Sequence, residues 1–334
     1  MIKTISIIGD GGWGTTLAIH LAKKEYGVVL WGAFADYVSQ TAQSRENRKF
    51  LPGYRIPASV ELTADINRAI AFGDLIVLAC PSEYLTSVLK KIKTTSYKDK
   101  IFLSVIKGIH PVTFQRMSEI IKEELGSVQL AVLSGPTIAG EVAAGLATTA
   151  VVACPQNRLA LEIQKIFHTS SFRIYTNHDV IGTEIGGSVK NVIAIACGIC
   201  DGFGLGTNAK AALLTRGLTE ITRLGVALGG KKETFYGLTG LGDLVTTCVS
   251  PQSRNRSVGE ALGKGKKIKD ILGPMAMVAE GVITSKAVHC LSRKLKISMP
   301  IVEQVYKIIY EGQDSHKAMS DLMTRQPKAE IKAK

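Results

Sequence analysis

Over the first 180 residues, short apolar runs alternate with segments whose apolar residues recur at helical spacing. Apolar runs that end in glycine, proline or polar residues are typical of strands buried in a parallel sheet. They predict strands at 5–8, 27–31, 75–80, 101–105, 130–133, 148–154 and 172–175. The segments between them predict helices, for example at 15–24, 35–43 and 113–125. Strands that alternate with helices indicate an α/β fold with a doubly wound, mostly parallel sheet.

The pattern changes near residue 180, because no convincing strand follows and helical spacing takes over. The helices predicted there lie at 182–200, 209–228, 232–235, 257–262, 284–293 and 301–310. We therefore expect a sheet domain over 1–180, followed by an all-helical C-terminal domain over 181–334. The charged tail at 328–334 is expected to fray.

The first predicted strand leads directly into a glycine-rich turn. Gly9, Gly11 and Gly14 have G-x-G-x-x-G spacing between a strand and a helix, the context that this motif requires. The first glycine permits the tight turn, the second lets the backbone approach a pyrophosphate, and the third lets the helix pack on the strand. Free N–H groups at the helix N-terminus also attract phosphate. We expect a Rossmann-like dinucleotide site; the alternative is a glycine turn that binds no nucleotide.

Composition narrows the class of protein. A chain of 334 residues suggests about two domains. A net charge of +13 is compatible with nucleic acid or with anionic small substrates. The densest lysine run, at 264–269, lies among glycines without interleaved aromatic residues, so we interpret it as a solvated loop and expect no nucleic-acid partner.

The sequence also bears on location. We expect no membrane insertion, since we expect no apolar run to reach the ~18 residues of a membrane span. We expect no signal peptide, because the first residues lead directly into a strand. Six cysteines without framework spacing indicate the reducing cytoplasm. Cys197 and Cys200 lack a second pair, so we interpret them as core packing and expect no metal.

Polar residues follow three of the predicted strands, at the sheet edge where α/β proteins bind ligands. Ser82 follows the strand predicted at 75–80, Lys107 follows the one at 101–105, and the segment 134–137 follows the one at 130–133. A lysine at such a strand end could bind an anionic substrate. The alternative for Lys107 is an ordinary surface lysine.

The helical half contains chemistry of its own. Lys190 and Asn191 lie in an otherwise apolar, small-residue segment, where a lysine is costly unless it is paired. Desolvation and nearby cations would lower its pKa, which suits acid–base catalysis; the alternative is a side chain that reaches solvent. Asp243, in a glycine-rich loop, could orient a lysine. Arg254 and Asn255 supply planar donors near a helix start, which suits a phosphate.

Together these segments resemble the NAD(P)-dependent glycerol-3-phosphate dehydrogenases of the bacterial soluble type. The resemblance covers about residues 4–325 and rests on the segments 9–14, 47–53, 107–109, 134–137, 187–191, 208–218, 240–244, 253–256 and 280–281. It implies NADPH or NADH as cofactor and a small phosphorylated substrate. The implied reaction interconverts dihydroxyacetone phosphate and sn-glycerol 3-phosphate and supplies phospholipid synthesis in the cytoplasm. A homodimer is a further candidate assembly.

The resemblance also implies roles for individual residues. Lys190 would be the proton donor and acceptor, with Lys107 and Asp243 completing the catalytic set. The implied substrate-binding residues are Lys107, Gly135, Thr137, Lys190, Asp243, Ser253, Arg254 and Asn255. The implied cofactor-binding residues are Gly9, Gly11, Gly12, Trp13, Gly14, Lys107, Ala139, Arg254 and Glu280.

The chain departs from the family pattern near the cofactor. Asp10 replaces a small residue between the first two glycines, which is unfavourable beside a pyrophosphate unless the side chain points away. Gly12 stands where serine is frequent. The segment 28–35 holds no acidic residue for a ribose 2′-hydroxyl, which many NAD sites use. Because Arg45, Arg48 and Lys49 could reach a 2′-phosphate, we expect NADPH to be accepted, alone or with NADH.

Three other functions fit parts of the sequence. One is a two-domain dehydrogenase of the hydroxyacid or 6-phosphogluconate kind, which Arg254 and Asn255 argue against. Another is a catalytically silent dinucleotide sensor, which the presence of Lys107, Lys190 and Asp243 together argues against. The third is a basic nucleic-acid binder.

Overall fold

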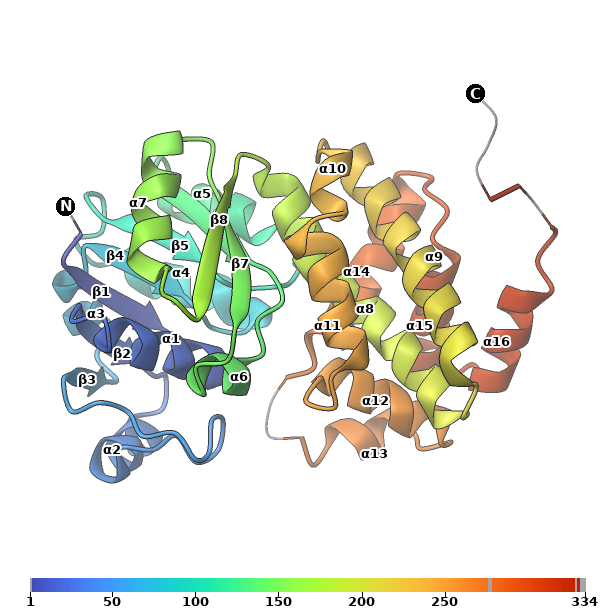
Figure 1. Ribbon diagram of the computed structural model, residues 1–334, viewed down its shortest axis with the longest axis horizontal. Helices are drawn as coiled ribbons and strands as arrows, with labels where there is room; N and C mark the ends of the chain where they lie inside the picture. Colours follow the sequence, from blue (N-terminus) through green and yellow to red (C-terminus); the bar gives the residue numbers. More distant parts are fainter. Residues whose placement is uncertain (1, 276–277, 328, 331–334) are drawn as a thin grey trace.

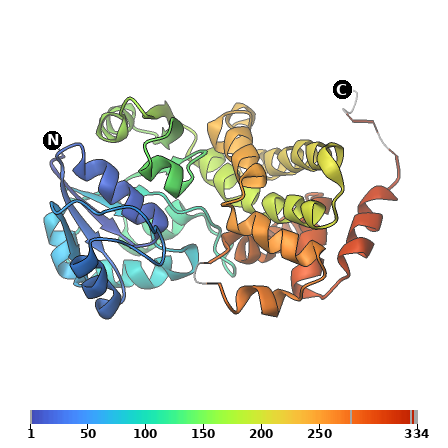
Figure 2. The same ribbon diagram turned by 60° about the horizontal axis from the view of Figure 1, so that its bottom comes forward.

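The molecule consists of two parts that lie side by side. The computed structural model describes residues 2–275, 278–327 and 329–330. The N-terminal part contains the sheet and its covering helices, and the C-terminal part is helical (Figure 1). Figure 2, turned by 60°, shows the same division.

The N-terminal part is built on one sheet of eight strands, with the order β3-β2-β1-β4-β5-β6-β7-β8. Neighbouring strands run parallel, except that β6 and β7 are antiparallel. The predicted doubly wound, mostly parallel sheet is therefore confirmed. The strands are β1 (Thr4–Ile8), β2 (Gly27–Trp31), β3 (Val60–Thr63), β4 (Leu75–Leu78), β5 (Ile101–Ser104), β6 (Gln129–Ser134), β7 (Thr148–Ala153) and β8 (Phe172–Asn177).

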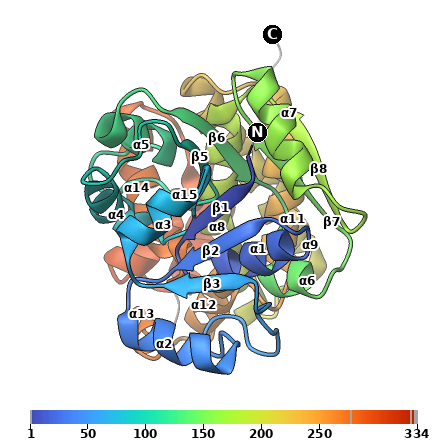
Figure 3. The ribbon, with the colours of Figure 1, turned by 90° about the vertical axis from the view of Figure 1, so that its left-hand side faces the viewer.

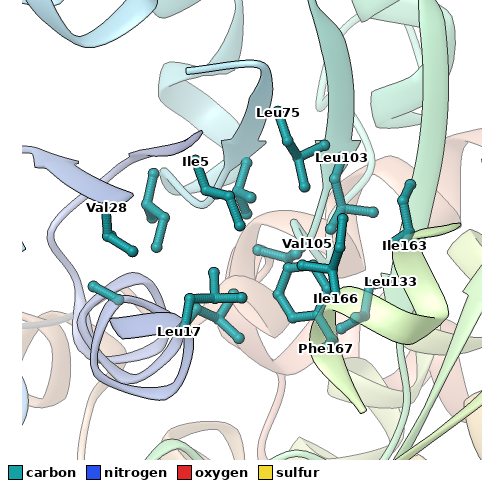
Figure 4. Packing of buried hydrophobic residues seen from close by; sticks show 14 of the residues in the cluster. Ile5, Leu17, Val28, Leu75, Leu103, Val105, Leu133, Ile163, Ile166 and Phe167 are labelled. Atoms are coloured by element: carbon teal, nitrogen blue, oxygen red, sulfur yellow. The ribbon is translucent and has the colours of Figure 1, made fainter. Parts of the chain in front are cut away.

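Helices cover both faces of this sheet (Figure 3). One face packs on α1 and α7, whose Leu17, Ile163 and Phe167 join strand residues such as Ile5 in one apolar core (Figure 4). The other face packs on α3, α4 and α5 in a second core. The helices are α1 (Gly12–Ala22), α2 (Ala35–Ser44), α3 (Ile66–Phe72), α4 (Leu85–Ile92), α5 (Met117–Leu125), α6 (Ala139–Ala143) and α7 (Asn157–Phe167).

The C-terminal part is organised around one long helix, α8 (Val180–Gly202). Every residue of α8 from 182 to 200 is buried, and α9, α11, α12 and α14 pack on it (Figure 1). The other helices are α9 (Gly206–Ala227), α10 (Lys232–Phe235), α11 (Asp243–Val249), α12 (Arg254–Gly263), α13 (Ile268–Leu272), α14 (Glu280–Lys294), α15 (Pro300–Tyr310) and α16 (Ser315–Met323).

The sequence interpretation overlooked one property of α8. By length and composition this helix is apolar enough to cross a membrane, contrary to the expectation that no segment is. Of its most apolar window, 83% is buried inside the protein. Its apolar character is therefore that of a core helix, enclosed by its neighbours. Cys197 and Cys200 lie on this helix as buried, free thiols.

Close contact between α8 and α12 depends on glycine. A β-carbon on Gly198 would lie 2.0 Å from the carbonyl oxygen of Arg256, and one on Gly259 would lie 2.0 Å from that of Ile195. The two backbones can touch only because these side chains are missing. The contact holds α12, which begins at Arg254, against the C-terminal half of α8.

Three local predictions need correction. The helix expected from 113 begins at Met117, because Phe114 adopts a left-handed backbone with φ 62° and Arg116 caps the helix. The glycine-rich loop expected around Asp243 is a π-helical turn, Leu238–Gly242, that leads into α11. The lysine run expected as a loop is partly helical, since Lys269 lies in α13.

Candidate functional site

A buried ion pair joins two helices of the C-terminal part. Lys190, in the middle of α8, donates a 2.6 Å hydrogen bond from Nζ to Oδ1 of Asp243, the first residue of α11. Lys190 is 5% exposed and Asp243 1%. Nζ of Lys190 also donates to Oγ1 of Thr247, one turn further along α11. The lysine therefore does not reach solvent; it is held by a carboxylate and a hydroxyl.

A second lysine reaches the same carboxylate from the sheet. Lys107 follows β5, and its Nζ donates to Oδ2 of Asp243 at 2.8 Å. The same nitrogen donates to the carbonyl oxygen of Gly135 at 2.9 Å and to Oγ1 of Thr137 at 3.3 Å, both beyond the end of β6. Asp243 thus binds two ammonium groups, one from each part of the molecule. The structure brings together Lys107, Gly135, Thr137, Lys190 and Asp243.

This arrangement perturbs the acid–base behaviour of Lys190. Desolvation by burial lowers the pKa of Lys190 to about 8, and the positive charge of Lys107 acts in the same direction. The negative charge of Asp243 opposes both effects. A lysine with this pKa exists in both protonation states close to neutral pH, so it can donate and accept a proton.

The predicted phosphate-binding residues lie at the beginning of α12. Ser253 is the N-cap, and its Oγ accepts a hydrogen bond from the backbone N–H of Arg256 at 3.3 Å. Arg254 is solvent-exposed and donates from Nη1 to the carbonyl oxygen of Val278 at 2.6 Å. Partial desolvation lowers the pKa of Arg254, although the charge of Glu280 opposes this shift. Arg254 is therefore a cation, and the N–H groups that Val278 does not engage can bind an anion.

Asn255 has a different environment from Arg254. Its Nδ2 donates to Oδ1 of Asn191 on α8 at 3.0 Å, and its Oδ1 accepts the backbone N–H of Gly281 at 2.9 Å. The amide thus fastens α12 to α8 and α14. Because both ends of the amide are engaged, this geometry gives Asn255 a positioning role beside the one implied by the resemblance.

Glu280 connects the two parts of the molecule. Its Oε1 accepts the backbone N–H of Ser82 at 2.9 Å, and its Oε2 accepts the Ser82 hydroxyl at 2.5 Å. Ser82 follows β4, so these bonds reach from α14 to the sheet edge. Burial raises the pKa of Glu280, and the hydrogen bonds from Ser82 limit that rise.

The glycine loop fits a dinucleotide pyrophosphate. Gly9 has φ +126°, and a β-carbon there would lie 2.7 Å from the backbone of Ala79. A β-carbon on Gly14 would lie 1.9 Å from the carbonyl oxygen of Gly9, so α1 touches the turn. Gly11 is the N-cap of α1, and no atom lies within 4 Å of a β-carbon placed on it. The space beside Gly11 and the uncapped N–H groups of α1 suit phosphate oxygens.

The remaining cofactor candidates surround this loop. Ala139, at the beginning of α6, accepts a hydrogen bond from Thr16 Oγ1 at 3.1 Å and lies beside Gly12. Trp13 packs edge-on against Phe172, with ring centroids 6.4 Å apart. Sequence reasoning did not find Thr247. Its spacing of four residues from Asp243 would have pointed to it once that segment was recognised as a helix.

Two negative observations limit the site. A cavity of about 570 Å³ lies between α8, α9, α15 and α16, but the lysine–aspartate cluster does not line it. We assign the site by the chemistry of its groups, because that cavity offers mainly apolar side chains. Within residues 2–275, 278–327 and 329–330, no group of three or more His, Cys, Asp or Glu side chains is placed to hold a metal ion.

The chain is similar to known proteins over nearly its whole length. The family model for the N-terminus of NAD-dependent glycerol-3-phosphate dehydrogenase matches residues 4–160, and the model for its C-terminus matches residues 179–320. A glycerol-3-phosphate dehydrogenase [NAD(P)+] of Chlorobium limicola is 47% identical over 98% of this chain and 99% of its own. The corresponding protein of Prosthecochloris aestuarii is 48% identical, with the same coverage.

A solved structure extends the similarity to the whole fold. The crystal structure of glycerol-3-phosphate dehydrogenase from Coxiella burnetii superimposes with a TM-score of 0.94 at 39% identity, covering 97% of this chain and 99% of that one. Sequence and structure therefore agree across both parts of the molecule, and the chain belongs to the family of NAD-dependent glycerol-3-phosphate dehydrogenases.

Proposed function

We propose that this chain interconverts dihydroxyacetone phosphate and sn-glycerol 3-phosphate with a nicotinamide cofactor. The observation that carries the proposal is the buried cluster in which Asp243 binds both Lys107 and Lys190. A ketone reduction needs a proton donor at the carbonyl oxygen and positive charge to stabilise the alkoxide that develops. Lys190 and Lys107 supply these two requirements, and family membership supplies the substrate.

Each member of the cluster has a distinct role. In the reduction, Lys190 donates a proton from Nζ to the oxygen on C2, and in the oxidation it accepts that proton. Lys107 stabilises the negative charge on this oxygen, and Asp243 orients both ammonium groups. The bound cofactor supplies or accepts the hydride at C2. The lowered pKa of Lys190, about 8, supports this role because the proton must be released as well as held.

The substrate phosphate is assigned to the beginning of α12. Arg254 offers a planar fork of donors that matches phosphate oxygens. Ser253 and the end of β6, with Gly135 and Thr137, complete the proposed substrate site. Binding energy at the phosphate, remote from C2, fixes the reacting carbon.

The proposal extends to the organisation of the chain. Residues 1–180 form the dinucleotide-binding domain, and residues 181–334 form the substrate domain. Gly12, Trp13 and Ala139 beside the glycine loop, together with Lys107 and Glu280, would hold the cofactor. Six free cysteines support a cytoplasmic enzyme that supplies phospholipid synthesis, and a homodimer is the proposed assembly.

The direct test is the oxidation of NADH and NADPH by the purified chain with dihydroxyacetone phosphate. We expect turnover that depends on the phosphorylated ketone. A 2-oxoacid as the better substrate would favour the hydroxyacid class of dehydrogenase. Cofactor binding without turnover on either substrate would favour a dinucleotide sensor.

A further inference from the structure

The carboxylate of Asp10 lies at the end of the neighbouring strand, away from the site of the pyrophosphate. β1 and β2 are adjacent and parallel, and the backbone N–H of Gly9 donates to the carbonyl oxygen of Trp31 at 2.9 Å. Asp10 and Gly32 therefore leave the sheet side by side. A β-carbon on Gly32 would lie 2.3 Å from Oδ2 of Asp10, so the carboxylate rests on the bare Cα of Gly32.

This position is the one that a ribose-binding acid takes in many NAD sites. There, a carboxylate at the end of the second strand accepts hydrogen bonds from the adenosine ribose. In this chain the residues after β2 are Gly32, Ala33 and Phe34, which offer no charge. Asp10 brings a carboxylate to the same place from the glycine loop, and Gly32 leaves the room for it.

The surroundings leave this carboxylate available. Asp10 is half-buried, and within the described residues no side chain donates a hydrogen bond to its carboxylate oxygens. Its backbone is fixed, because Nδ2 of Asn47 donates to the Asp10 carbonyl oxygen at 2.7 Å and to Oγ1 of Thr15 at 2.7 Å. A fixed acceptor to which no described side chain donates is suited to a ribose hydroxyl.

The cations expected to reach a 2′-phosphate make other contacts in the structure. Arg45 donates to the carbonyl oxygens of Ile56, Pro57 and Val60, so its guanidinium is engaged within its own loop. The Arg48 side chain is 76% exposed and pairs with Glu46 at 3.5 Å. Lys49 lies over the ring of Phe50, 5.1 Å from its centroid. Burial raises the pKa of Asp10, and a hydrogen bond from its own backbone and the charge of Lys49 limit that rise.

We propose that Asp10 accepts a hydrogen bond from the 2′-hydroxyl of the adenosine ribose and thereby makes this enzyme prefer NADH to NADPH. This inference rests on the proposed function, because it concerns the cofactor of the same site. The 2′-phosphate of NADPH lacks the hydroxyl donor and brings negative charge against the carboxylate. The sequence-based expectation that NADPH is accepted through Arg45, Arg48 and Lys49 stays a prediction, and this inference predicts that NADH is bound more tightly.

The test measures binding without turnover. Calorimetric titration with ADP-ribose and with its 2′-phosphorylated form isolates the adenosine half of the cofactor, and NADH and NADPH repeat the comparison with the whole molecule. We expect the parent to bind the unphosphorylated ligands about 10- to 100-fold more tightly, the range of one charge-assisted hydrogen bond. Asp10→Ala and Asp10→Asn should reduce this ratio to about 3-fold or less.

A matched control separates a direct contact from general charge. Asp36, an exposed acid in the first turn of α2, lies near the same edge, and Asp36→Asn removes the same charge. We expect Asp36→Asn to keep the parent ratio. Thermal unfolding of each variant shows whether the fold is retained.

Three results would overturn the proposal. The first is a parent that binds both forms equally or prefers the phosphorylated form, and the second is an Asp10→Ala variant that loses both in equal measure. The third is an Asp36→Asn variant that reproduces the effect of Asp10→Asn. The titrations contain no dihydroxyacetone phosphate, so they measure cofactor preference independently of turnover. Failure to reduce dihydroxyacetone phosphate would contradict the proposed function but would not change the measured affinity ratios.

Discussion

The glycine loop and the lysine–aspartate cluster are built in opposite ways. The loop works through missing side chains, at Gly9, Gly11 and Gly14, within six consecutive residues. The cluster works through charged side chains from α8, from α11 and from the segment after β5, and the hydrogen bond from Lys107 to Asp243 spans 136 residues. The first depends on local backbone geometry, whereas the second depends on how the N-terminal and C-terminal parts of the molecule meet. Substitutions should therefore separate cofactor affinity from chemistry.

The largest effect is expected for Lys190→Ala. Loss of the general acid should lower turnover by about 10² to 10⁴-fold. Affinity for NADH should change little, because the glycine loop belongs to the other part of the molecule. Steady-state kinetics with dihydroxyacetone phosphate and calorimetry with NADH measure the two quantities. Near-parent turnover would remove Lys190 from its proposed role.

Arg254→Ala should follow in size and affect the substrate selectively. Loss of a charge-assisted bond to phosphate should lower kcat/KM for dihydroxyacetone phosphate. The expected loss of transition-state stabilisation is about 1.5–3 kcal/mol. The much poorer reaction with dihydroxyacetone, which has no phosphate, should barely change. Equal losses on both ketones, together with weaker NADH binding, would place Arg254 on the cofactor instead.

Gly11→Val tests the loop alone. Nothing lies within 4 Å of a β-carbon at this position, so the melting temperature should stay near that of the parent. NADH binding should weaken by about 10- to 100-fold, because overpacking at the pyrophosphate costs about 1–3 kcal/mol. Gly14→Ala is the contrasting variant, since its β-carbon would meet the Gly9 carbonyl at 1.9 Å and should lower the melting temperature. A Gly11→Val protein that binds NADH normally would show that the site is misplaced.

The smallest expected effect is the pH dependence of the rate, which should have opposite signs for ketone reduction and for alcohol oxidation. The pKa of Lys190 is lowered to about 8, so the protonated donor is lost as pH rises through 8. Ketone reduction should therefore slow above this pH, by up to about tenfold per pH unit, whereas alcohol oxidation should become faster. Asp243→Asn should move both limbs to lower pH, because the carboxylate favours the charged lysine. Limbs that stay in place would show that another group titrates.

The contrast between local backbone geometry and contacts between distant residues also explains how much of the structure could be predicted from the sequence. β2 was predicted with its observed bounds, because its short apolar run begins at Gly27 and is followed by Gly32, and a short run flanked by glycine favours a buried strand over a helix. β3 was missed: it is four residues long and mostly half-buried at the sheet edge, so no clear pattern marks it. The π-helical turn before Asp243 was taken for a loop, because three glycines in the segment 237–242 mask the helix that follows.

The site itself was only partly accessible to local reasoning. The sequence flagged Lys190 as costly in its apolar segment, but no local pattern shows that its partner is Asp243, 53 residues away. The residues suggested only that Asp243 could orient a lysine, the resemblance to the family grouped Lys107, Lys190 and Asp243 in one site, and the structure then supplied the geometry. Asp10 shows the reverse case, since its departure from the family pattern was visible in the sequence but its position over Gly32 was not.

The shared carboxylate of Asp243 has a consequence for proton uptake. With Lys190 protonated, the three charged groups together carry one positive charge, and with Lys190 neutral they carry none. A phosphorylated ketone is an anion, so it binds more tightly to the protonated form. Thermodynamic reciprocity then requires that the bound substrate raise the proton affinity of Lys190. At a pH near or above the pKa of Lys190, about 8, binding of dihydroxyacetone phosphate therefore draws from solvent part of the proton that its own reduction consumes.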